Sequence, residues 1–223
     1  RARDRDRGQH RPGAGRRRGP ARSNFEVGRS GHQPRAIVVH TTDGTFNGTL
    51  FWFRSPESRV SAHYLIALDG RIVELVDEAD TAFHAGHERH PEITVLGDDS
   101  PNHVTIGIEF EDAGRPADIE RPDAQYRTGA LLLADIAERW DIPLDRDHVL
   151  LHNLINRAKT CPGNLDLDRL LAMALEITSG LAAAPDAHMA GALVCAKWLS
   201  SSMAQDLRST TLKSTAVMSV AVK

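Results

Sequence analysis

The sequence predicts one α/β domain with a central mixed β-sheet flanked by helices. Short apolar runs typical of buried strands alternate with segments of helical periodicity, and two of the runs are joined by Asp69-Gly70. Asp-Gly between apolar stretches is a strong hairpin signal, so residues 62–76 are expected to form two antiparallel strands. A hairpin within an α/β pattern makes the sheet mixed. We place the domain at residues 31–179.

Two short apolar runs end at a histidine. AIVVH at 36–40 precedes the turn-prone TTDGT, and HVLLH at 148–152 has the same character. Runs of this length bounded by polar or turn residues suit buried strands. His40 and His152 are therefore expected at strand ends, which is a favourable position for a functional side chain.

The segment VTIGIEFED at 104–112 alternates apolar and other residues. Successive side chains of a strand point to opposite faces. One face is expected to carry Val104, Ile106, Ile108 and Phe110. The other is expected to carry Thr105, Gly107, Glu109 and Glu111. Glu109 should therefore point away from an apolar face of the sheet.

Three segments are expected to be helical. LFWFRSP at 50–56 has one apolar side and stops at a proline. The segment from 123 to 140 has helical spacing of its large apolar residues and starts at Asp123, a plausible N-cap. Residues 165–177, LDLDRLLAMALEI, are amphipathic and end near a Ser-Gly pair.

The N-terminal segment is strongly basic. Residues 1–22 contain nine arginines and two aspartates, so the remainder of this chain of net charge −3 is acidic. Residues 1–22 contain no aliphatic side chain larger than alanine or proline and bury too little surface to order themselves, and we predict that the N-terminal segment 1–30 is disordered. Without interleaved aromatic residues or a helical period, the arginines are interpreted as a solvated tail, and no nucleic-acid partner is expected.

Residues 180–223 are rich in Ala, Ser and Thr and are treated as an appendage of unknown role, in which 191–207 could form one helix. No run of eighteen apolar residues occurs, so no membrane span is expected. Neither the localisation nor the oligomeric state follows from the sequence, and the absence of a signal pattern does not settle export.

Three residues of chemically reactive types lie close together in the sequence near the C-terminal end of the predicted domain. His152, Lys159 and Cys161 lie within ten positions, in HNLINRAKTCPG. Imidazole and thiolate are good zinc ligands, and His40 could complete a set of three with an open fourth position. Two other interpretations stay open at this point: Cys161 as a nucleophile activated by a neighbouring cation, or as a small buried apolar residue. With only Cys195 as a second cysteine, no disulfide framework is indicated.

Five motifs occur in order along the chain, together with His152: VVHTT at 38–42, RVSAHYLIALDGRIVELV at 59–76, AFHAG at 82–86, TIGIEFE at 105–111 and KTCPG at 159–163. These motifs resemble those of the zinc-dependent N-acetylmuramoyl-L-alanine amidases of the amidase-2 type, a family that includes the peptidoglycan recognition proteins. The resemblance covers about residues 34–175 and implies a Zn²⁺ cofactor. By this resemblance His40, His152 and Cys161 are the zinc ligands.

The resemblance also implies roles around the metal. Lys159 corresponds to the lysine that stabilises the oxyanion, and Glu109 to the general base. His84, in AFHAG, either lines the substrate groove or has a structural hydrogen-bonding role, and we predict that it binds substrate. Some members of the family carry a catalytic tyrosine where this chain has Ala62. Tyr64 is expected on the same strand face as Ala62, but it does not match the position of that tyrosine, and we do not include it among the predicted catalytic residues.

The activity implied is zinc-dependent hydrolysis of the amide bond between N-acetylmuramic acid and L-alanine, with peptidoglycan or muropeptides as substrates. The alternative is a non-catalytic peptidoglycan-binding recognition module, and a cysteine-dependent hydrolase is a second rival. The resemblance does not distinguish an endolysin from a bacterial remodelling or recycling amidase, nor does it reveal the preferred stem peptide or sugar.

Overall fold

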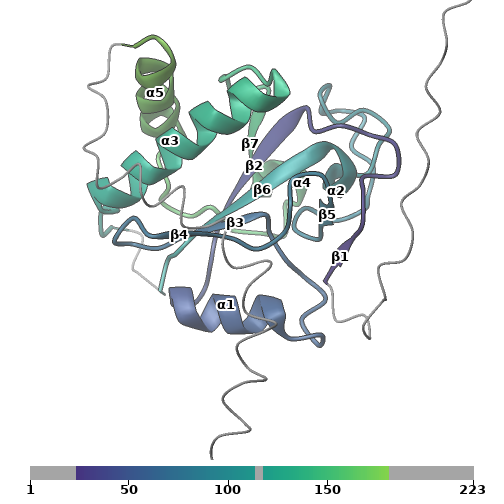
Figure 1. Ribbon diagram of the computed structural model, residues 1–223, viewed down its shortest axis with the longest axis horizontal. Coiled ribbons are helices and arrows are strands. Elements are labelled where there is room, and N and C mark those ends of the chain that lie inside the picture. The colour runs from purple at the N-terminus through teal and green to yellow at the C-terminus, as the bar shows by residue number, and fades with distance from the viewer. Residues whose placement is uncertain (1–23, 114–117, 181–223) are drawn as a thin grey trace, which may run out of the picture.

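The computed structural model describes residues 24–113 and 118–180 (Figure 1). Its five-stranded sheet contains, in spatial order, β4 (Ile72–Glu74), β3 (Tyr64–Ile66), β6 (Thr105–Phe110), β2 (Ala36–Thr41) and β7 (Val149–Leu151). Four of these strands are parallel to their neighbours, and β4 pairs with β3 antiparallel through the Asp69-Gly70 turn. The predicted mixed sheet and its hairpin are confirmed.

Helices cover both faces of the sheet. The long helices α3 (Asp123–Trp140) and α5 (Leu167–Thr178) lie on one face, and α1 (Phe46–Arg54) lies on the other (Figure 1). The remaining elements are short: β1 (Phe25–Glu26), β5 (Thr81–Ala82), α2 (Pro101–Val104) and α4 (His152–Ile155). None of the helices in the described part of the chain is long and apolar enough to cross a membrane.

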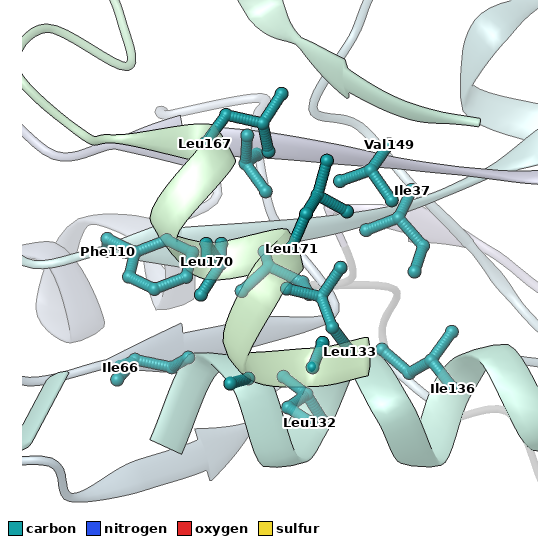
Figure 2. Close-up of a cluster of buried hydrophobic side chains, with 14 of the residues drawn as sticks. Ile37, Ile66, Phe110, Leu132, Leu133, Ile136, Val149, Leu167, Leu170 and Leu171 are labelled. Atoms are coloured by element: carbon teal, nitrogen blue, oxygen red, sulfur yellow. The ribbon is translucent and has the colours of Figure 1, made fainter. Parts of the chain in front are cut away.

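The main core lies between the sheet and the α3–α5 pair. Side chains from β2, β3 and β6 pack there against leucines and isoleucines of both helices (Figure 2). Ile106, Ile108 and Phe110 contribute to this core, as the alternation predicts. The prediction for Val104 was wrong, because Val104 ends α2 one residue before the strand begins and packs in a second cluster with Val38.

Two predicted helix starts need correction. The first helix begins at Phe46 rather than near residue 50, because the side chain of Thr45 caps it by accepting a hydrogen bond from the Gly48 N–H at 3.2 Å. Asp123 is the first residue of α3 and not its N-cap. Pro122 occupies the cap position without a side-chain hydrogen bond, and the Asp123 carboxylate pairs with Arg169.

The N-terminal limit of the fold also differs from the prediction. Residues 24–30, which fell in the segment expected to be disordered, belong to the fold: β1 pairs with β5, and Arg29 is buried. The Arg29 guanidinium donates to the carbonyl oxygens of Glu78, His103 and Thr105 at 2.6–3.0 Å. These acceptors offset the cost of burying its charge. The rest of the basic segment and the predicted helix at 191–207 lie outside the described residues.

Candidate metal centre and catalytic cavity

The three expected ligands come together at one edge of the sheet. His40 lies near the end of β2, and His152 begins α4 directly after β7. Because β2 and β7 are adjacent parallel strands, their carboxyl ends meet at the same edge. Cys161 follows in the loop after α4, where its carbonyl accepts from the Asn153 N–H at 3.1 Å.

The separations of the ligand atoms lie on either side of the distance between two ligands of a tetrahedral zinc site. The distance from Cys161 Sγ is 3.0 Å to His152 Nδ1 and 4.0 Å to His40 Nδ1. All three ligand atoms lie within 4.8 Å of one another. Bond lengths of about 2.1 Å to nitrogen and 2.3 Å to sulfur place two tetrahedral ligands about 3.6 Å apart. Within the described residues, no other group of three such side chains is this close.

The protonation of these side chains also fits a metal centre. Burial lowers the pKa of His40 well below its ordinary value, with further lowering by His84. Burial and the nearby Lys159 lower the pKa of His152 to about 4. Burial raises the pKa of the Cys161 thiol to about 11. Both imidazoles are therefore neutral, as ligands must be, and the thiol holds a proton that a metal ion would displace.

Glu109 lies on the strand next to His40, and its Cα is in register with that of His40 across β2 and β6. Its Oε2 atom is buried and has no hydrogen-bond partner among the described residues. Burial raises the pKa of this carboxyl to about 8, Asp43 adds to the rise, and Lys159 opposes it. A buried carboxyl with an unused oxygen and a pKa near neutrality has the properties of a general base or acid.

The triad and Glu109 line one cavity of about 420 Å³. Lys159 borders it from the loop before Cys161, and its side chain is otherwise exposed. An apolar wall of this cavity is formed by Trp52, Phe53, Val60 and Phe83. The cavity thus combines a candidate metal centre, a buried carboxyl and a cation with a surface suited to a partly apolar substrate.

Two histidines of the matching motifs lie on the same face of the sheet. His84 borders the cavity, and its Nδ1 lies 3.0 Å from Nε2 of His40. A hydrogen-bonding role is thus present, while its predicted contact with substrate stays a prediction. His63 is fully buried and accepts from the Gly107 N–H at 2.9 Å through Nδ1, with Arg29 at 2.8 Å from its other nitrogen.

Tyr64 takes no part in the cavity. Its hydroxyl donates to Glu78 Oε1 at 2.7 Å, and its ring packs in the core beside α3. The sequence reasoning missed Asp43 and Thr105. Asp43 follows His40 by three residues in the turn TTDGT, and Thr105 shares the strand face of Glu109, so the alternation of 104–112 contained a signal for the latter.

The mixed α/β sheet thus brings together a His-His-Cys triad that could hold a metal ion and a glutamate on the neighbouring strand. The chain belongs to the Amidase_2 family, described as N-acetylmuramoyl-L-alanine amidase, whose model matches residues 30–164. The family and the fold expected from the sequence are confirmed.

Relatives agree with this assignment. N-acetylmuramoyl-L-alanine amidase A of Achromobacter lyticus is 37% identical over 97 residues, which are 43% of this chain and only 45% of that protein. The 1,6-anhydro-N-acetylmuramyl-L-alanine amidase AmpD of Salmonella typhimurium (strain SL1344) is 31% identical over 150 residues, or 59% of this chain and 75% of that one. The structure of the N-acetylmuramyl-L-alanine amidase AmiD from E. coli, in complex with the substrate anhydro-N-acetylmuramic acid-L-Ala-D-gamma-Glu-L-Lys, matches 78% of this chain and 64% of that one, with a TM-score of 0.53 and 26% identity.

Proposed function

We propose that this protein uses a zinc ion held by His40, His152 and Cys161 to hydrolyse the amide bond between N-acetylmuramic acid and L-alanine in peptidoglycan or muropeptides. The observation that carries the proposal is the convergence of three neutral donor atoms, within 4.8 Å of one another, on the cavity that Glu109 lines. The substrate class is that of the relatives, of which AmiD is in complex with an anhydro-muramyl peptide.

Zinc bound there would supply Lewis acidity toward the scissile carbonyl and would activate water for attack. The ionised form of Glu109 takes the proton of the attacking water and delivers it to the departing alanine nitrogen, acting first as base and then as acid. The ammonium of Lys159 stabilises the negative charge that develops on the carbonyl oxygen, because it borders the same cavity. His84, whose ring borders the cavity, is proposed to contact the substrate.

The protonation states of Cys161 and His152 argue against the cysteine-hydrolase alternative. A nucleophilic pair needs a thiolate beside an imidazolium. Here burial raises the pKa of Cys161 and lowers that of His152, so the two side chains are a thiol and a neutral ring at pH 7. A divalent metal ion bound between the two side chains would displace the proton of the thiol. The neutral imidazole would then donate its lone pair to the same ion.

The test uses the full chain with purified peptidoglycan and with a defined anhydro-muramyl peptide. We expect mass spectrometry to find free stem peptide with a new alanine amino terminus, and expect its release to stop with a chelator and resume with added zinc. Binding to peptidoglycan without release would instead establish the recognition module. Release that survives chelation but is abolished by thiol alkylation of the zinc-loaded protein would establish the cysteine hydrolase.

A further inference from the structure

The ring of His84 lies directly against the sheet beneath the candidate metal centre. A Cβ atom built on Gly107 would come within 2.4 Å of His84 Cγ and 2.5 Å of its Nδ1, distances that real Cβ atoms do not show. The backbone is held as well, because Asn102 Oδ1 accepts from the N–H groups of His84 and Ala85 at 3.1 and 2.8 Å. The position of the ring is therefore fixed, and any side chain other than glycine at residue 107 would overlap with it.

A chain of hydrogen bonds fixes the proton of this ring. The Thr105 hydroxyl donates its single proton to the Pro101 carbonyl at 2.7 Å. The contact between Thr105 Oγ1 and His84 Nε2, 3.2 Å long, must then be donated by the imidazole. With the proton on Nε2, Nδ1 of His84 carries a lone pair and accepts from Nε2–H of His40 at 3.0 Å.

The tautomer of His84 determines which nitrogen of His40 can bind a metal ion. A neutral His40 with its proton on Nε2 has its free lone pair on Nδ1, which is the atom that faces Cys161 Sγ. We propose that His84 is a positioning residue, which fixes the tautomer and ring orientation of His40 for metal binding through a chain anchored at Thr105 and given room by Gly107. This inference rests on the proposed metal centre. Partners of this kind typically contribute 10–100-fold to metal affinity, so about that loss is expected without the acceptor.

The experiment measures the zinc dissociation constant of the full chain by competition with a chromogenic chelator, without substrate. His84→Leu removes the acceptor and should weaken zinc binding about 10–100-fold. His84→Asn places an amide oxygen near the position of Nδ1 and should bind nearly as tightly as the parent. Thr105→Val should weaken binding too, because the proton of His84 is then no longer held on Nε2. A residue that only contacts substrate would leave all three affinities unchanged.

Gly107→Ala has a matched control on the other face of the sheet. At Gly129, in α3, an added Cβ would come within 2.6 Å of Phe110 Cε1, so Gly129→Ala overpacks the core to a similar degree. Both variants should lower the melting temperature of the zinc-free protein, but only Gly107→Ala should lower zinc affinity. Equal zinc affinities for these two variants would overturn the role of Gly107.

Two further outcomes would overturn the positioning role of His84. One is parental zinc affinity in His84→Leu, and the other is an equal loss in His84→Asn and His84→Leu. The failure of the proposed function looks different: a parent that binds zinc but releases no stem peptide refutes the activity and leaves this inference intact, whereas a parent that binds no zinc refutes both. If His84→Leu does not fold, the Asn and Thr105→Val variants decide.

Discussion

Glu109 lies in β6, and Glu111 follows one residue after the strand ends. Replacing each of them in turn separates an effect on catalysis from an effect on stability. Glu109 and Glu111 are two residues apart on the same face, and both are largely buried. Glu109 Oε2 has no hydrogen-bond partner among the described residues. The two carboxylate oxygens of Glu111, in contrast, accept from the N–H groups of Phe46 and Leu68 at 2.7 and 2.8 Å. The same change of a carboxylate to an amide therefore removes different things at the two positions.

Glu109→Gln should abolish proton transfer while the fold remains. General base catalysis is typically worth about 10²–10⁴-fold, and no neighbouring carboxylate other than Asp43 borders the cavity to replace it. We therefore expect kcat to fall by about that factor, or about 3–5 kcal/mol of transition-state stabilisation. Stability should not fall, because no hydrogen bond of Oε2 is lost.

Glu111→Gln should do the reverse. An amide has one acceptor oxygen, so its NH₂ group would face one of the two backbone N–H donors, and an unsatisfied buried donor costs about 1–3 kcal/mol. The melting temperature should drop, while kcat measured well below it should stay near that of the parent. This control separates loss of the base from general loss of structure.

The assay is kcat on a defined muropeptide with zinc content and thermal unfolding of each variant at one pH. A loss of kcat below about threefold in Glu109→Gln with zinc intact is far short of the effect of a general base and would remove Glu109 from the mechanism. Equal losses of kcat in both variants would show that the strand, and not the carboxyl of Glu109, is what activity requires.

Three further predictions follow from the same contacts. Cys161→Ala should reduce zinc content and activity together, whereas Cys161→Asp should keep part of both because a carboxylate also binds zinc; metal analysis beside turnover checks this. Burial alone raises the pKa of Glu78, but hydrogen bonds led by that from Arg139 lower it below its ordinary 4.5. Its stabilising contribution is thus present above the ordinary pKa and is lost as the pH falls through the lowered one, so the destabilisation by Glu78→Gln should shrink in acid, as denaturant titrations at pH 7 and pH 3 would show. Leu170→Ala, which empties a fully buried core position, should cost about 2–5 kcal/mol of unfolding free energy in the same titrations.

The sequence was most informative where one physical rule acts alone. The period of two in residues 104–112 assigned Glu109 to the face opposite Ile106 and Ile108, because strand pleating admits no other arrangement. The sequence predicted that His40 and His152 lie at strand ends. Because the structure shows these two strands to be parallel neighbours, the two histidines lie close together. The joining of Cys161 to them came from the family resemblance, since nothing in the spacing of the loop specifies where its thiol lies.

The sequence was less informative where a residue depends on distant partners. Arg29 falls in a segment whose composition indicates disorder, yet it is buried because carbonyl groups from three separate positions receive it. Tyr64 shares a motif with His63 but is held toward α3 by Glu78, whose carboxylate also accepts from Arg139. Such pairings join residues far apart in the chain, and local patterns do not contain them.

The alternation of β6 also explains why one strand serves three different needs of the site. Thr105, Gly107 and Glu109 share one face because they are two residues apart. The first anchors the proton of His84, the second leaves space for its ring, and the third presents a carboxyl beside His40. A one-residue shift of this strand against β2 would move all three to the core face at once, so the pairing of His40 with Glu109 sets the metal centre and the base together.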